Sequence, residues 1–292
     1  MRILCSNGDT TIEFGYALPY WLNDVSGLFG EETNVLTSDS ATHHGGIYLG
    51  THSNARNIVI SAYVIDNYLA SRRTLEKLFS PETQGTLTYI DDREYFIDYY
   101  AESFEMSPSG KVRNITISLI CPDPLFKGAP ETKFLGGKKG LLTFPFTHHE
   151  PFMISEYYTN DTVTIQNTNS LDTGMIIRII INANGLPSNF NPTIVNVKTK
   201  EELILNTHAI DGVVEWNIGD YYEISTYFGK KKVEFISGDT RTSVLSTWLA
   251  NNTWLQLHPG SNTFRTFCNR GTVQANIPIR YEFVSRQEYW TV

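Results

Sequence analysis

The sequence predicts a mainly β protein that has an N-terminal α+β domain with one short helix and a C-terminal β-sandwich. Residues 45–126 contain runs in which apolar and polar residues alternate, and a single helical segment lies among them. Residues 122–140 hold prolines and glycines without this alternation, which indicates a domain boundary. From residue 141 onward, short strand-like segments recur with almost no helical pattern, as in a jelly roll.

The first strand and the helix of the N-terminal domain have clear signals. Residues 57–65 alternate apolar and polar side chains, which predicts a strand. The segment SRRTLEKLF at 71–79 has leucine and phenylalanine at helical spacing; Ser71 is expected to cap this helix and Pro81 to end it. A helix of about nine residues needs tertiary packing to form, so we expect it to lie against the sheet.

Three further strands complete the N-terminal domain. A turn at Asp91 and Asp92 is expected between the first two, and a turn at 107–110 is expected before the third. One helix against several antiparallel strands makes this an α+β domain dominated by its sheet. The three strands are expected at 85–90, 94–100 and 112–121.

The C-terminal half is expected to consist of short strands and turns. Asn-Gly at 184–185, Asp-Gly at 211–212 and Pro-Gly at 259–260 mark turns. Eight or more strands in about 150 residues are typical of a β-sandwich. We expect strands at 162–166, 174–181, 193–197, 202–205, 221–226, 232–236, 253–257 and 276–283.

Composition and charge exclude several classes of function. The net charge of −8 opposes nucleic-acid binding, which needs a basic surface, and suits a protein that docks on basic partners. No run of 18 apolar residues is present, so we expect no membrane insertion. The first residues, MRILCSNGDT, hold too few apolar side chains for a signal peptide, so we expect synthesis in the cytoplasm.

The cysteines give no pattern of a metal site or of a disulfide framework. Cys5, Cys121 and Cys268 are odd in number, far apart and without a CxxC pair, so a reducing compartment is expected. They also lack the sequence context of a nucleophile. We predict no catalytic, cofactor-binding or metal-binding residue, no cofactor and no enzymatic activity.

Clustered histidines and charges are interpreted as parts of loops and turns. Neighbouring residues of a strand point to opposite faces, so adjacent histidines suit one metal ion poorly. The glycine-lysine segment at 136–140 lacks phosphate-loop spacing, and a lysine run at 230–232 is expected at a hairpin tip, with docking of an acidic partner as a minor alternative. The clusters are His43-His44, His148-His149-Glu150, Glu31-Glu32, Asp91-Asp92 and Glu201-Glu202.

One cluster near the C-terminus leaves sugar binding open. Aromatic faces together with amide and guanidinium donors are what a sugar ring requires. Trp254 also fits a core position of the strand expected at 253–257, and core and turn roles are the favoured interpretation. The cluster consists of Trp248, Asn251, Asn252, Trp254, Asn262 and Arg265.

The order of these elements resembles the distal tail proteins of long-tailed bacteriophages. The matching features in residues 1–130 are a glycine-rich entry to Arg56-x-Ile58, the helix with Leu75 and Leu78, the Gly-x-Leu-x-Tyr strand that starts at residue 85, and the Cys-Pro-Asp-Pro exit at 121–124. In the C-terminal half, GDYYEISTYFGKKKV at 219–233 and WLQLHPGSNTFR at 254–265 resemble the galectin-like jelly roll of the same family.

The resemblance implies a structural protein of the virion tail tip. It implies a split-barrel-like domain at 1–130 that closes a ring of six subunits, a linker at 131–140 and a galectin-like domain at 141–292. The expected partners are further copies of the chain, the tail tube protein, the tail-associated tip protein and a receptor-binding protein, with weak contact to host glycans as an additional option.

Two other classes of function stay open at this point. One is a carbohydrate-binding module for host cell-wall glycans, and the other is a jelly-roll glycan hydrolase. The sugar-binding motifs of galectins, His-x-Asn-x-Arg and Trp-x-x-Glu-x-Arg, do not stand at His258 or Trp254. Galactoside binding is therefore not expected, and Trp254 is predicted to be structural.

Overall fold

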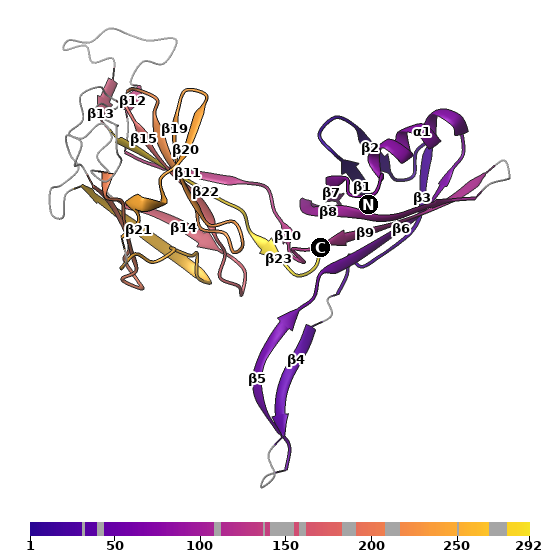
Figure 1. The fold of residues 1–292 in the computed structure, drawn as a ribbon, viewed down its shortest axis with the longest axis horizontal. Helices are drawn as coiled ribbons and strands as arrows, with labels where there is room; N and C mark the ends of the chain where they lie inside the picture. The colour runs from indigo at the N-terminus through magenta and orange to yellow at the C-terminus, as the bar shows by residue number, and fades with distance from the viewer. Residues whose placement is uncertain are drawn as a thin grey trace. The chain divides into compact units, whose positions relative to one another are not determined.

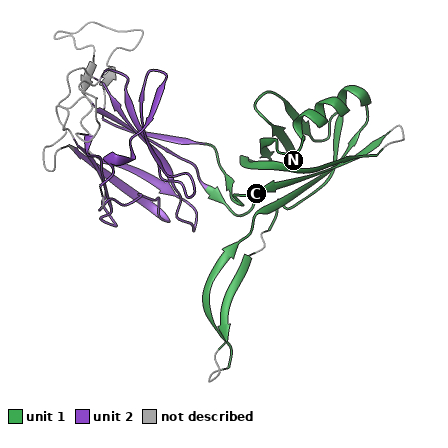
Figure 2. Ribbon diagram, in the orientation of Figure 1, with its two compact units in different colours: residues 1–129, 288–292 green, residues 130–287 purple. Residues whose placement is uncertain are grey.

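The chain divides into two compact units (Figure 2). The first comprises Met1–Ala129 and Glu288–Val292, and the second comprises Pro130–Gln287. No helix of the described part is long and apolar enough to cross a membrane. The computed structural model describes residues 1–30, 33–39, 44–107, 112–136, 138–140, 155–157, 162–182, 191–207, 217–249, 251–268 and 279–292.

The first unit is built on an antiparallel sheet with the strand order β2-β1-β7-β8-β9-β6-β3 (Figure 1). One face of these strands is apolar, and its alternating residues form the core of the unit. The short strands β10 (Phe126–Lys127) and β23 (Glu288–Tyr289) pair with each other, and β10 also pairs with β8. The seven main strands are β1 (Arg2–Ser6), β2 (Thr11–Phe14), β3 (Tyr20–Ser26), β6 (Arg56–Val64), β7 (Gln84–Ile90), β8 (Glu94–Met106) and β9 (Arg113–Cys121).

The two edges of this sheet meet between β2 and β3. A bridge joins Gly15 to Trp21, the Leu22 N–H donates to the Gly15 carbonyl at 2.7 Å, and the Gly15 N–H donates to the Tyr20 carbonyl at 3.3 Å. The sheet therefore curls until its first and last strands touch. This closure agrees with the split-barrel-like α+β fold that the sequence and the resemblance predicted.

Helix α1 (Tyr68–Leu78) covers the apolar face of the sheet, as the sequence predicted. Leu75, Leu78 and the following Phe79 are buried in the core. The predicted start was wrong, because the helix begins before Ser71, with Asn67 in the left-handed region as the preceding residue. Ser71 lies inside the helix and is buried, and its hydroxyl donates to the Asp66 carbonyl at 3.3 Å.

A hairpin of β4 (Thr33–Asp39) and β5 (Gly46–Ser53) extends from the end of the sheet between β3 and β6 (Figure 1). Its two strands form a sheet of their own. Every described residue of β4 is exposed, and β5 is exposed or half-buried along its length. No pattern in the sequence predicted this hairpin.

The second unit is a β-sandwich, as predicted. Side chains from both sheets form one core, in which the rings of Phe264 and Phe283 stack at 5.6 Å. One sheet has the order β11-β22-β15-β18-β19-β20 and consists of β11 (Glu131–Leu135), β22 (Ile279–Ser285), β15 (Met175–Ile181), β18 (Tyr221–Ser225), β19 (Lys232–Ser237) and β20 (Thr240–Ser243). The other has the order β14-β21-β16-β17 and consists of β14 (Thr162–Asn167), β21 (Gly260–Cys268), β16 (Pro192–Asn196) and β17 (Glu202–Ile204). A further pair is β12 (Lys138–Gly140) with β13 (Ser155–Tyr157), and η2 (Leu245–Thr247) is a 3-10 turn.

Three predicted segments of the second half differ in the structure. Residues 131–140 are not a free linker. Strand β11 pairs with β22 and buries Leu135, and β12, which pairs with β13, begins at residue 138. The segment expected as a strand at 253–257 is irregular apart from a bridge between Leu257 and Thr173. The turn expected at 259–260 leads directly into β21, which was not predicted. The turns expected at 108–110, 184–185 and 211–212 lie outside the described residues.

Candidate assembly surface

Two cysteines of the first unit are buried and unreactive. Cys5 and Cys121 are both inaccessible to solvent and are not joined by a disulfide. Burial raises the pKa of the Cys121 thiol to about 12, and burial together with the nearby Cys121 raises that of Cys5. A thiol that stays protonated is a poor nucleophile. These side chains therefore contribute to packing.

The described histidines and acids do not gather into a metal site. No group of three potential ligands occurs among the residues that the structure describes. Asp91 and Asp92 occupy the turn between β7 and β8, as expected, where Asp92 lies 3.8 Å from Arg93. Glu201 accepts from a ring nitrogen of His258 at 3.1 Å. Residues 31–32, 43 and 148–150 lie outside the described part.

The two tryptophans of the possible sugar site stack on each other. Trp248 and Trp254 have ring centroids 4.0 Å apart and planes 18° apart, and Lys231 lies over the Trp254 ring at 5.6 Å. Both rings are half-buried against the core of the sandwich. The prediction that Trp254 occupies a core position of a strand was wrong. Trp254 lies in an irregular segment, and part of its side chain remains exposed to solvent.

The amide side chains of the same cluster bind the backbone. Asn252 donates to the Ile204 carbonyl at 2.6 Å and accepts from the Ile204 N–H at 2.9 Å. Asn262 is buried and makes the same pair of bonds to His258, at 2.6 and 3.0 Å. Arg265 lies over the ring of Phe267 at 4.8 Å. The cluster thus braces loops and presents no convergent set of sugar ligands.

The hairpin of β4 and β5 carries an unusual amount of exposed apolar surface. Large apolar side chains are normally covered, and clusters of exposed ones mark contact sites. The hairpin has five of them, each between 54% and 65% exposed. They are Val35, Leu36, Ile47, Tyr48 and Leu49.

These apolar side chains lie on both faces of the hairpin. Successive residues of a strand point to opposite faces, so Val35 and Leu36 are on different sides. Tyr48 pairs with Thr37, which places it on the face of Val35, and Ile47 pairs with Ser38, which places it on the face of Leu36. Both faces of the hairpin therefore carry exposed apolar side chains.

A second exposed apolar group lies at the corner where the sheet closes. Tyr16 and Leu18 are 66% and 62% exposed, and Trp21 is 39% exposed. The rings of Tyr16 and Trp21 meet edge to face at 5.6 Å, a favourable geometry for an aromatic pair. The first unit therefore presents exposed apolar side chains on the hairpin and also on this corner.

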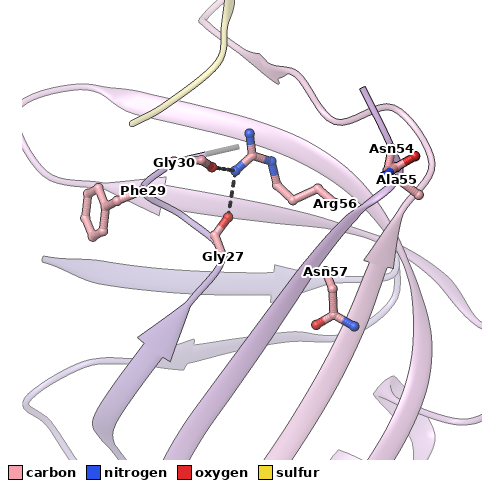
Figure 3. A pocket seen from close by; sticks show the side chains of 7 residues that line it. All are labelled: Gly27, Phe29, Gly30, Asn54, Ala55, Arg56 and Asn57. Atoms are coloured by element: carbon pink, nitrogen blue, oxygen red, sulfur yellow. Dashed lines mark hydrogen bonds between the residues drawn. The ribbon is translucent and has the colours of Figure 1, made fainter. Parts of the chain in front are cut away.

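Arg56 fixes the root of the hairpin (Figure 3). It begins β6 directly after the hairpin, and its guanidinium donates to the carbonyls of Gly27 and Gly30 in the segment that leads into the hairpin, both at 2.7 Å. It also donates to Pro124 at 2.8 Å and to Trp290 at 2.6 Å. Arg56 is 6% exposed. Arg56 is one of the residues that carry the family resemblance, but this anchoring role was not predicted from the sequence.

The pocket beside Arg56 is formed by the root itself. It has a volume of about 380 Å³, and the Arg56 hydrogen bonds cross it (Figure 3). Because several guanidinium donors are occupied by backbone carbonyls, the pocket serves the anchoring of the hairpin. Its lining residues are Gly27, Phe29, Gly30, Asn54, Ala55, Arg56 and Asn57.

Comparison with known proteins connects this architecture to phage tails. Residues 16–121 match the family model described as a phage tail protein RIFT-related domain. The chain is similar to the Dit protein (gp 19.1) of phage SPP1, with a TM-score of 0.62 and 15% identity over 92% of this chain and 93% of that one. It is also similar to a chain of the phage P2 baseplate in its activated conformation with Ca, with a TM-score of 0.57 and 13% identity over the full length of both. No curated protein matches the chain.

The same P2 baseplate with Sr gives a TM-score of 0.56 at 13% identity. The matched family segment runs from the corner residue Tyr16 to Cys121 at the end of β9, so it includes the hairpin. The resemblance to siphophage distal tail proteins that the sequence indicated is confirmed.

Proposed function

We propose that the protein is a structural component of a phage tail tip, a distal tail protein whose copies form a ring, expected to hold six subunits. The observation that carries this proposal is the hairpin of β4 and β5, which has exposed apolar side chains on both faces and lies within the segment that matches the tail-protein family. Such a surface suits a subunit that is completed by its neighbours.

The energetics of the hairpin favour assembly. An isolated two-stranded hairpin is marginally stable in water. Burying a large aliphatic side chain contributes about 1.5–3 kcal/mol, so covering even part of the five exposed side chains offsets the cost of ordering the ribbon. The hairpin and the corner of Tyr16, Leu18 and Trp21 are different surfaces of one unit. Contact between different surfaces of identical copies is heterologous, and such contacts generate a ring when the rotation from one subunit to the next closes.

The expected partners follow from the same proposal. The ring joins the tail tube protein on one side to the tail-associated tip protein and the receptor-binding apparatus on the other, and the protein acts in the virion tail after synthesis in the host cytoplasm. It supplies contact surfaces and no catalysis. The SPP1 Dit protein is described as a paradigm of the hub adsorption apparatus of phages that infect Gram-positive bacteria, which supports this placement.

A carbohydrate-binding module is the weaker candidate for the second unit. The side-chain amides of Asn252 and Asn262 donate hydrogen bonds to backbone carbonyls, and the Trp254 ring is partly covered by Trp248 and Lys231. A glycan hydrolase would need two carboxylates that face a common sugar site, and the six-residue cluster that includes Trp248 and Trp254 contains no carboxylate side chain. Assembly therefore accounts better for the described surfaces.

The hairpin is tested by placing a charge on it. In the Leu36→Asp variant, the protein concentration at which half of the chains are assembled should rise at least tenfold, because a carboxylate would be buried in the subunit contact. Ser38→Asp is the matched control, since it adds the same charge to the same face and strand, and its effect should be smaller. Sedimentation velocity measures the assembly, and unchanged melting of both variants shows that the units stay folded. Unchanged assembly of the Leu36→Asp variant would reject the hairpin as the ring contact.

A further inference from the structure

The turn between β18 and β19 exposes a phenylalanine almost completely. Phe228 is 95% exposed, more than any other large apolar side chain among the described residues. The Lys230 N–H donates to the Tyr227 carbonyl at 3.1 Å, and Gly229 has a φ of +71°. These values define a hydrogen-bonded four-residue turn with Phe228 at its second position and glycine where a positive φ is needed.

The base of this turn is held in place by buried hydrogen bonds. Thr226 is inaccessible to solvent, and its hydroxyl bonds the Met175 N–H at 2.9 Å and the Met175 carbonyl at 3.2 Å. Gln256 donates to the Thr226 carbonyl at 2.9 Å. Gly174 allows the chain to approach so closely that an added Cβ would lie 2.4 Å from the Tyr227 Cα. The turn is therefore pre-organised, which reduces the entropy lost on binding.

The surroundings of Phe228 are aromatic and basic. Lys231 lies over the ring of Trp254, which stacks on Trp248. The turn segment 226–231 and the bracing segment 249–256 contain two lysines and no acid, although the chain as a whole carries a net charge of −8. A surface of this kind attracts an acidic partner and steers its approach.

We propose that this tip, composed of Phe228, Lys230, Lys231 and the Trp248–Trp254 pair, docks a second protein of the tail. The partner has an apolar pocket that receives the Phe228 ring and acidic side chains around it that face the two lysines. A few side chains packed in pockets near the centre of a contact carry most of the binding energy, and aromatic ones are common among them. This inference rests on the proposed function, because it assigns one of the tail partners to the second unit.

A photo-cross-linker at position 228 tests the docking in complete tails. The phage that encodes the full chain would carry p-benzoylphenylalanine in place of Phe228, and its purified tails would be irradiated and analysed by mass spectrometry. We expect an adduct with a tail protein other than this chain. The matched control is the same cross-linker at Ile218, which is 63% exposed and precedes β18, at the opposite end of that strand. The control should give little of that adduct.

The cross-linked protein would then be produced alone and titrated with the intact chain. Phe228→Ser should weaken the affinity at least tenfold without changing the melting temperature, and Lys230→Glu should weaken it and reduce its salt dependence. An adduct with another copy of this chain, an adduct with added host cell-wall polysaccharide, or equal labelling from both positions would overturn the proposal. If the tails contain a ring of this protein but give one of these three results, only the docking tip is rejected. If the tails contain no such ring, the proposed function is rejected as well.

Discussion

Arg56 is the residue on which the geometry of the hairpin root depends. Its planar guanidinium bonds four carbonyls from three separate segments and lies over Phe126 at 4.9 Å. Sequence patterns could place Arg56 at the start of a strand but could not show these bonds, because their partners are 26 to 234 residues away.

Replacement of Arg56 by lysine should destabilise the first unit by about 2–4 kcal/mol, because one ammonium cannot reach all four carbonyls and the abandoned ones lose their donors. Denaturant unfolding of the intact chain measures the change. The control is Arg72→Lys, which alters an exposed i,i+4 pair with Glu76 and should change the stability by less than about 0.5 kcal/mol. Equal stability of Arg56→Lys and the wild type would contradict the structural role.

His258 should make the stability of the second unit depend on pH. The hydrogen bond to Glu201 is the main cause that raises the His258 pKa, and the bond to Asp172 at 2.9 Å adds to it. Both ring nitrogens face carboxylates, so the protonated ring suits the site best. Because the His258 pKa is higher in the folded protein than in the unfolded chain, protonation stabilises the folded state. This stabilisation is complete below the unfolded-chain pKa of about 6.5 and is lost as the pH rises through the folded-state pKa.

Unfolding at a series of pH values tests this effect. Between pH 6 and 9 the wild type should lose stability that the His258→Gln variant does not lose. His52→Gln, which alters an exposed residue of β5, should keep the wild-type slope. A wild-type slope in His258→Gln would show that other groups govern the dependence.

At the scale of the elements, the alternating patterns predicted the buried strands well. Strands β6, β7 and β9 bury every second residue, and their sequences carry much of this period of two, whereas β15 has the same burial pattern in an almost wholly apolar run. The hairpin of β4 and β5 was missed because its apolar residues occupy both faces and so break the alternation. Strand β21 was missed because Pro259-Gly260 was interpreted as the turn after a strand at 253–257, whereas Gly260 is already the first residue of β21.

The strand pair β10–β23 predicts that the last five residues stabilise the first unit. Tyr289 meets the ring of Tyr95 at 5.2 Å, and both Tyr289 and Val292 pack on the first core. Residues 1–130 alone should therefore melt several degrees lower than residues 1–129 joined to 288–292 by a short glycine linker, since about 1 kcal/mol shifts the melting temperature of a domain this size by several degrees. Calorimetry makes the comparison, and identical melting would show that the C-terminal strand is dispensable.

At the scale of the whole molecule, the second unit is an insertion in the first. The chain leaves the first unit after β10 and returns to it at β23, and these two strands pair with each other. The adjoining strands β11 and β22 belong to the second unit and also pair with each other. Composition predicted two β-rich domains, but it placed residues 141–292 wholly in the second. No local pattern could assign the last five residues to the first unit, because their pairing joins positions about 160 residues apart.

The central claim is that identical copies assemble into a ring through the first unit. Native mass spectrometry of the intact chain, combined with negative-stain images of the same sample and of samples with the tail partners, tests it most directly. We expect a mass of six chains and closed rings with six-fold symmetry. A monomeric mass at high micromolar concentration, with no rings on grids that contain the tail partners, would contradict the account.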